Sequence, residues 1–149
     1  KEYLAFHARE NRKRVVEDGG LMMGWGDLGR RISRWERFAA SHPSLEETST
    51  AIEPELSRMM SWYLVGTDNS PAYDFSKKGV IVTELLRSYE AFLRDNRESG
   101  YFDLINKIHA SLQTSRGSIK KDVLALLSGA GYRSRYLEQQ ATRLFAAPR

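Results

Sequence analysis

The sequence predicts an all-α fold, a single compact bundle or array of about six to seven helices. Apolar residues recur at the helical spacing of three and four positions, and no stretch alternates between apolar and polar residues over the length of a strand. With 149 residues, 41% of them apolar, the chain suffices for one domain with a substantial core. We therefore treat residues 1–149 as one helical domain, and because the chain begins at Lys1 we expect a fragment of a larger protein.

Residues that start and stop helices set the predicted boundaries. The clearest helix runs from Asp27, which can cap its first turn, to Ser41, where His42-Pro43 prevents its continuation. Ser44 and Glu47 then have the spacing of a capping box and predict a short helix or turn. The predicted helices are residues 2–16, 27–41, a short segment after 44, one with Pro54 in its first turn, 76–95, 101–116, a short helix capped by Ser118, and 134–146 closed by Pro148.

The helix predicted over residues 76–95 has the widest apolar face, and we expect it to lie at the centre of the core. The stretch before it, GTDNSPAYD from Gly66 to Asp74, consists of residues that favour turns. The inward residues of the central helix are Ile81, Val82, Leu85, Leu86, Tyr89, Phe92 and Leu93.

Composition excludes several kinds of function. The chain has no cysteine, which rules out disulfides and thiolate chemistry and fits a cytoplasmic or other reducing compartment. No apolar run reaches the roughly 20 residues of a membrane span, so we expect a water-soluble domain. No phosphate-binding, nucleophile-elbow or zinc-protease motif is present, and His7 with Glu10 supplies only two metal ligands. We therefore expect no metal, no cofactor and no catalytic residue.

The stretch EDGGLMMGWGDLGRR places apolar residues in a glycine-rich turn that would ordinarily be polar. These residues either pack as a plug on the helices or stand out as a contact for a partner, because methionine adapts to many surfaces and tryptophan anchors interfaces. The net charge of +4 favours an acidic partner. The leading interpretation is a non-catalytic protein-interaction module that binds an acidic or apolar protein surface through Leu21, Met22, Met23, Trp25, Arg30, Arg34 and Arg37.

The C-terminal pair of predicted helices gives the first alternative, a nucleic-acid-binding domain. Its outline of a short helix, a glycine turn and a second helix matches a helix-turn-helix, although any pair of antiparallel helices has that outline. The polar and basic side chains of the second helix have the chemistry that reads base edges and holds phosphates. The residues concerned are Arg133, Arg135, Tyr136, Gln139, Gln140 and Arg143.

Glycan hydrolysis is the second alternative. Residues 19–26, GGLMMGWG, resemble the glycine-rich active-site hairpin of small phage-type lysozymes, which are compact, basic and largely helical. The resemblance implies a glycoside hydrolase in which Glu17 and Asp27 flank a cleft, one carboxyl donating a proton and the other remaining ionised. Carboxylates in such places also cap helices, and Asp27 stands where a cap is expected.

Overall fold

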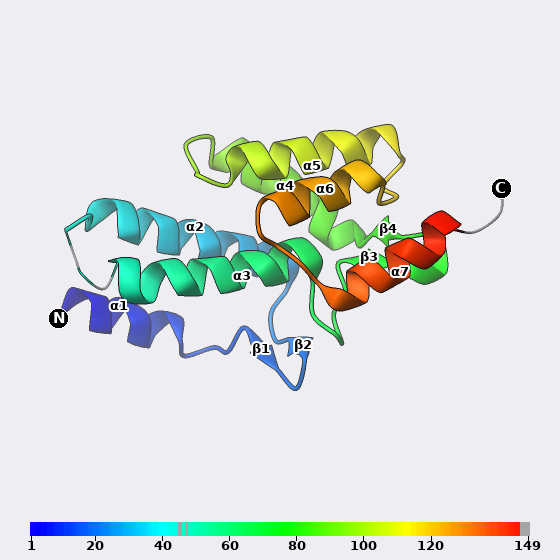
Figure 1. The fold of residues 1–149 in the computed structure, drawn as a ribbon. Coiled ribbons are helices and arrows are strands. Elements are labelled where there is room, and N and C mark those ends of the chain that lie inside the picture. Colours follow the sequence, from blue (N-terminus) through cyan, green and yellow to red (C-terminus); the bar gives the residue numbers. More distant parts are fainter. Residues whose placement is uncertain (45, 47, 147–149) are drawn as a thin grey trace.

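The computed structural model describes residues 1–44, 46 and 48–146 and confirms the predicted helical fold (Figure 1). Two antiparallel pairs of very short strands accompany the helices within these residues. The α-helices are α1 (Glu2–Glu10), α2 (Trp25–Ser41), α3 (Glu53–Val65), α4 (Thr83–Asp95), α5 (Phe102–Thr114), α6 (Lys121–Gly129) and α7 (Arg135–Ala146). The strand pairs are β1 (Val16–Glu17) with β2 (Gly20–Leu21), and β3 (Tyr73–Asp74) with β4 (Val80–Ile81).

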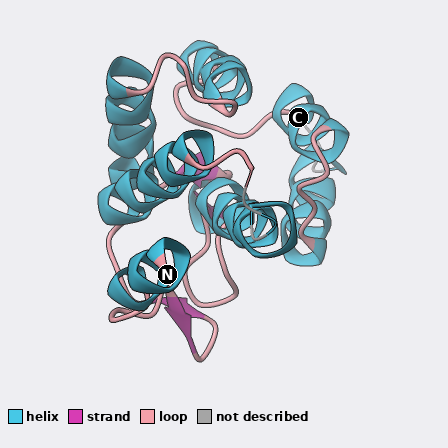
Figure 2. Ribbon diagram, turned by 90° about the vertical axis from the view of Figure 1, so that its left-hand side faces the viewer, coloured by secondary structure: helices cyan, strands magenta, loops and turns pink. Residues whose placement is uncertain are grey.

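Helix α2 holds the arrangement together. It packs against both α3 and α4, while α4 also packs against α5, and α5 against α6 (Figure 1). The end-on view of Figure 2 shows the helices surrounding one interior, with the β1–β2 hairpin at its edge. One connected cluster of buried side chains draws on every one of α1 to α7, from Phe6 to Leu137. Among the described helices, none has both the length and the apolar character that crossing a membrane requires.

The β1–β2 hairpin corrects the prediction of a helix over residues 2–16, because α1 ends at Glu10. Asp18 and Gly19 connect the strands with φ values of 48° and 74°, the left-handed conformations of a two-residue type I′ turn. Asn69 secures the turn, donating its backbone N–H to the Gly19 carbonyl at 2.9 Å and its side-chain amide to the Asp18 carbonyl at 2.7 Å. The Asp-Gly pair was a usable hairpin signal, although two-residue strands are too short to show alternation.

The prediction of one helix over residues 76–95 was also wrong in its first part. Helix α4 begins only at Thr83, after a 3₁₀ turn at Phe75–Lys77 and strand β4. Lys78 and Gly79 have φ values of 58° and 69°, which no helix contains. The remainder of the prediction holds, since the buried face of α4 consists of Leu85, Ser88, Tyr89 and Phe92.

Some of the predicted helix caps are present in the structure and others are not. Ser118 does not cap α6, which begins at Lys121, but pairs with Val80 in an isolated bridge. Ser134 does cap α7, its Oγ accepting a hydrogen bond from the Leu137 N–H at 3.2 Å, and Pro54 lies in the first turn of α3 as expected. Glu47 of the predicted capping box and the closing Pro148 lie outside the described residues.

Helix α2 is capped from α4 rather than by Asp27. Asp27 lies within the first turn, and the Trp25 N–H donates instead to the Glu84 carboxylate at 3.2 Å. The hydroxyl of Ser88 donates to the Trp25 carbonyl at 3.1 Å, and Tyr63 Oη lies 2.7 Å from Ser88 Oγ. Because the single Ser88 hydroxyl proton is used on Trp25, Tyr63 is the donor to Ser88. These bonds join α2, α3 and α4 at one point.

Gly29 allows the three helices to come this close. A methyl group at Gly29 would lie 2.9 Å from Tyr63 Oη and 3.1 Å from Ser88 Oγ, closer than carbon and oxygen atoms pack. Gly26 in the same helix differs, because a methyl group there would meet only the flexible Arg30 guanidinium, at 3.4 Å. An alanine at Gly29 therefore tests close packing between the helices, whereas an alanine at Gly26 tests helix propensity alone.

Gly29→Ala is expected to lower the free energy of unfolding by about 1–3 kcal/mol through overpacking against Tyr63 and Ser88. Gly26→Ala is the matched control, expected to leave stability unchanged or to raise it by up to about 1 kcal/mol, because alanine favours the helix. Urea unfolding followed by far-UV circular dichroism measures both. Equal effects of the two substitutions would contradict the close approach of α2 to α3 and α4.

The far end of α2 holds the beginning of α1. His42 Nε2 lies 2.7 Å from a Glu2 carboxylate oxygen, and His42 Nδ1 lies 3.0 Å from the Phe38 carbonyl. These two acceptors, first the Phe38 carbonyl and then Glu2, raise the pKa of His42 above its ordinary value. The imidazole also stacks on the Phe38 ring at 4.3 Å, and that ring stacks on Phe6 of α1.

This contact predicts a pH dependence of stability. A raised folded-state pKa means that the stabilising effect of protonated His42 is complete below its unfolded pKa and is lost as the pH rises through the folded value. Thermal unfolding should show stability falling as the pH rises from about 6.5, the ordinary pKa of histidine, with the fall reduced in both His42→Gln and Glu2→Gln. A His42→Gln profile parallel to that of the unmodified chain would show that the contact does not stabilise the fold.

Candidate functional site

A basic pocket lies where the end of α1 meets the first turns of α2. It has a volume of about 250 Å³, and five cationic side chains line it against two carboxylates. Helix α1 supplies its last turn, the segment before β1 supplies the outer rim, and the turn between β2 and α2 supplies a methionine. The lining residues are Arg9, Glu10, Arg12, Lys13, Met23, Asp27, Arg31 and Arg34.

The buried carboxylate of Glu10 is the centre of this pocket. Only 8% of Glu10 is exposed, and its two oxygens accept hydrogen bonds from Arg34, Nε at 3.1 Å and Nη2 at 3.0 Å. The guanidinium groups of Arg31 and Arg9 lie 3.9 Å and 3.8 Å from it. Such a two-pronged contact suits the planar guanidinium fork of arginine, which fixes both the position and the orientation of the carboxylate.

Arg31 connects the pocket to the backbone of the outer rim. Its side chain is 4% exposed, and its guanidinium donates to the Lys13 carbonyl at 2.8 Å and to Asn11 Oδ1 at 2.9 Å. Burial lowers the pKa of Arg31, while the charge of Glu10 opposes that shift. Its Nε is buried and has no hydrogen-bond acceptor among the described residues. The pocket therefore contains more donors than acceptors.

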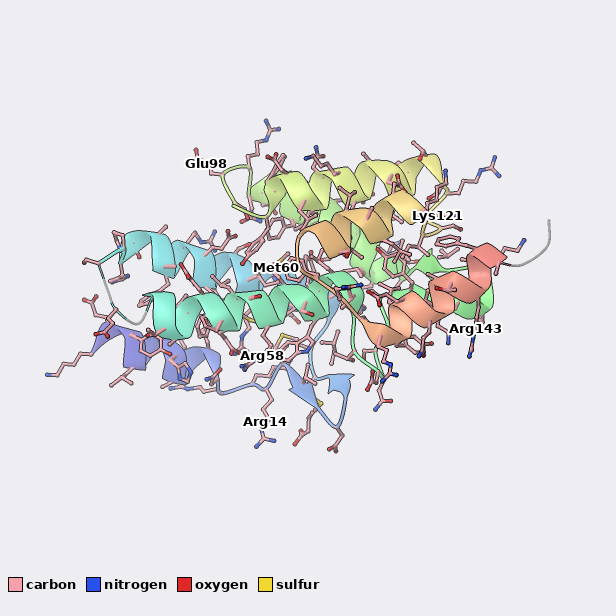
Figure 3. All side chains as sticks on the ribbon, in the orientation of Figure 1. Arg14, Arg58, Met60, Glu98, Lys121 and Arg143 are labelled. Atoms are coloured by element: carbon pink, nitrogen blue, oxygen red, sulfur yellow. The ribbon has the colours of Figure 1, made fainter. Side chains whose placement is uncertain are left out.

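The rim of the pocket remains positively charged. Asp27 is paired with Arg30 at 2.7 Å, and this hydrogen bond lowers the pKa of the Asp27 carboxyl. Within the described part of the chain, no carboxylate lies within ion-pairing distance of the exposed Arg12 and Lys13. Neighbouring Arg14 extends outward (Figure 3) and pairs with Glu17 at 3.0 Å. Both carboxylates of the pocket are thus already paired, and cations remain available at its rim.

The structure separates the residues predicted to bind a partner. Met23 and Arg34 line the basic pocket, and Arg30 lies beside it through its contact with Asp27. Arg37 instead lines a cavity on the other side of α2, together with residues 94–100. The remaining predicted residues are Leu21, half-buried in β2, Met22, 48% exposed, and Trp25, 6% exposed.

Trp25 is buried and belongs to the core, as the plug interpretation of this loop expected. Met22 is the most exposed apolar side chain of the loop. Sequence reasoning missed Arg9, Arg12, Lys13 and Arg31. The signal for Arg9, Arg12 and Lys13 was the run RENRKR at the end of α1, which indicates a charged rim once α1 is known to end at Glu10. Nothing local in the sequence indicates the pairing of Glu10 with a helix more than twenty residues away.

The carboxylates considered for glycan hydrolysis do not share a pocket. Asp27 lines the basic pocket, whereas Glu17 is exposed at the end of β1 and is not among the lining residues. For the metal possibility, His7 contacts the Asn11 amide while Glu10 is held by Arg34. The described residues contain no group of three or more potential metal ligands.

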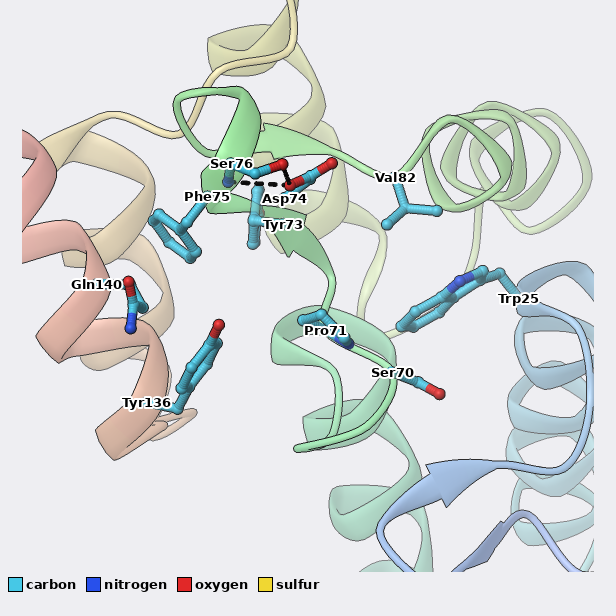
Figure 4. Close-up of a pocket in the computed structure, with 10 residues that line it drawn as sticks. All are labelled: Trp25, Ser70, Pro71, Tyr73, Asp74, Phe75, Ser76, Val82, Tyr136 and Gln140. Atoms are coloured by element: carbon cyan, nitrogen blue, oxygen red, sulfur yellow. Dashed lines mark hydrogen bonds between the residues drawn. The ribbon is translucent and has the colours of Figure 1, made fainter.

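A second cavity, which we call the α7 groove, has a volume of about 710 Å³ (Figure 4). Helix α7 forms one wall with Tyr136 and Gln140, and Trp25 stands at the opposite wall. The groove thus unites two residues predicted to bind nucleic acid with one predicted to bind a protein partner. Its other lining residues are Ser70, Pro71, Tyr73, Asp74, Phe75, Ser76 and Val82.

Helix α7 is placed differently from the second helix of a helix-turn-helix. It lies over the β3–β4 hairpin (Figure 1), where Leu144 comes close to Gly79. Of the predicted side chains, Arg135, Gln139 and Arg143 are exposed, while Arg133 pairs with Glu138 at 2.9 Å. Tyr136 and Gln140 line the groove, and Tyr136 remains 43% exposed.

Comparison with known proteins gives no match to this chain, neither among family models nor among curated proteins nor among solved structures.

Proposed function

We propose that this domain is a non-catalytic binding module whose basic pocket docks an acidic segment of another protein. The observation that supports the proposal most strongly is the pairing inside the pocket. Glu10 and Asp27 are each bound to an arginine, so the exposed Arg12 and Lys13 at the rim are left to pair with the carboxylates of a partner. The net charge of +4 adds long-range attraction for an acidic surface.

The shape and donors of the pocket favour carboxylate groups. Arg34 is held at one end by Glu10, and its side chain is still 42% exposed, so its position is fixed before a partner arrives. A preorganised guanidinium loses less side-chain freedom on binding than a free one.

Apolar side chains beside the pocket favour a protein partner. Met23 lines it and Met22 is exposed at the adjacent turn. Methionine adapts to varied apolar surfaces, which gives a mixed polar and apolar contact of the kind found between proteins. No aromatic ring lines this pocket, so it offers no surface on which a nucleobase could stack.

The state of the two carboxylates supports binding rather than acid catalysis. A general acid must hold its proton near neutral pH, which requires a raised pKa. The contact with Arg30 instead lowers the pKa of Asp27, and Glu10 accepts two hydrogen bonds from Arg34. The pocket is therefore arranged to keep negative charge paired, not to deliver a proton.

The proposal predicts that reversing the two unpaired rim charges weakens binding of an acidic polypeptide. Fluorescein-labelled poly-L-glutamate is the probe, titrated with the domain in fluorescence anisotropy at low salt. Arg12→Glu/Lys13→Glu is expected to raise the Kd about tenfold or more, because two attractive contacts become repulsive. Both side chains are exposed, so the fold should be retained, which circular dichroism checks.

Arg87→Glu/Arg97→Glu is the matched control, with the same change in net charge on exposed residues outside the pocket. It should weaken binding by less than about threefold, through the general charge of the domain alone. If both pairs weaken binding equally, the pocket has no special role. Absence of any binding by the unmodified domain would also overturn the proposal.

A further inference from the structure

The α7 groove presents aromatic rings to a ligand. Tyr136 is 43% exposed, and its ring meets the Phe75 ring edge-on at 6.4 Å (Figure 4). Trp25 and Val82 close the far side of the groove, and Pro71 lies between the two walls. An exposed ring at the mouth of an apolar groove provides a stacking surface for a flat, unstacked ring of a ligand.

Polar groups that can bind the edge of such a ring lie beside these aromatic side chains. The amide of Gln140 lies one helical turn beyond Tyr136 and lines the same wall. Asp74 Oδ1 accepts hydrogen bonds from the Ser76 N–H at 3.0 Å and the Ser76 hydroxyl at 2.6 Å, which lower the pKa of the Asp74 carboxyl. A fixed carboxylate and an amide together recognise ring nitrogens and amino groups, as carboxylates do with cytosine and glutamine does with adenine.

Cationic side chains flank the groove on both sides. Arg143 follows Tyr136 and Gln140 at helical spacing, so it continues their face of α7, and it extends into solvent in Figure 3. Lys77 and Lys78 are exposed directly after Phe75, with Lys77 3.7 Å from Asp74. Arg135 is exposed next to Tyr136. A backbone of phosphates passing over the groove would thus meet positive charge before and after the stacking surface.

We propose that the α7 groove binds single-stranded nucleic acid, with a base stacked on Tyr136 and phosphates held by Arg135, Arg143 and the lysines after Phe75. A single strand fits because its unstacked bases are free to enter the groove, whereas the bases of a duplex are held in the stack. This site does not rest on the proposed function, because no residue lines both the α7 groove and the basic pocket, although the two approach each other at Met23 and Trp25.

Fluorescence anisotropy with a labelled oligothymidylate of about 12 nucleotides tests the proposal. Tyr136→Ala is expected to weaken binding about tenfold or more, because the stacking surface is removed, whereas Tyr136→Phe, which keeps the ring, should bind almost normally. Arg135→Ala/Arg143→Ala should make the slope of log Kd against log salt shallower by about 1.4, the value for two lost phosphate contacts on a single strand.

Arg87→Ala/Arg97→Ala is the matched control and should leave that salt slope nearly unchanged, since both residues are exposed but lie in α4 and the segment after it, outside α7. Arg12→Glu/Lys13→Glu separates the two sites, because it should weaken the poly-L-glutamate interaction about tenfold or more while leaving the effect of Tyr136→Ala on oligothymidylate in place. Equal binding by the Phe and Ala variants of Tyr136 would overturn the proposal. A preference for duplex over single strand would also overturn it. The same holds if poly-L-glutamate displaces the oligonucleotide equally well from the Phe and Ala variants of Tyr136.

Discussion

The contacts of the buried Glu10 carboxylate with arginines of α2 are the interaction on which the basic pocket depends. An ionised group in that position needs several donors, and Arg34 and Arg31 supply them from one face of α2. The same demand directs the Arg31 guanidinium inward, where it also binds the backbone of Lys13. One buried charge therefore fixes α1, the segment between α1 and β1, and the first turns of α2, and the basic pocket is the surface that results.

The opposite face of α2 is fixed by close packing rather than by charge. Gly29 brings α2 within hydrogen-bonding reach of Tyr63 and Ser88, and Ser88 also binds the Trp25 carbonyl. The turn before α2 consequently has a rigid end, from which Met23 reaches the basic pocket while Trp25 reaches the α7 groove. This glycine-rich turn is apolar because Trp25 packs in the core and lines the α7 groove, and Met23 lines the basic pocket.

Helical periodicity predicted the architecture because the helices bury their faces in one core, and the positions of α2, α3 and α5 follow closely from it. The strands escaped prediction because pairs of two residues are held by distant partners, as the β1–β2 turn is by Asn69. Met23 and Arg34 were predicted from their chemistry to bind a partner, and the structure places both in the lining of the basic pocket. Glu10 and Arg31 were not, since their roles arise only when α1 folds back on α2, a contact between residues far apart in the sequence.

The most direct test of the central claim is an NMR titration that follows the arginine Nε–H signals of the domain as poly-L-glutamate is added. The buried cluster around Glu10 predicts that the signals of Arg34 and of the rim residue Arg12 move first and saturate together. Signals from Arg87 and Arg97, on the other faces of the domain, should move little. Uniform small shifts across all arginines, or shifts confined to Arg135 and Arg143 on α7, would contradict a specific acidic-partner site at the end of α1.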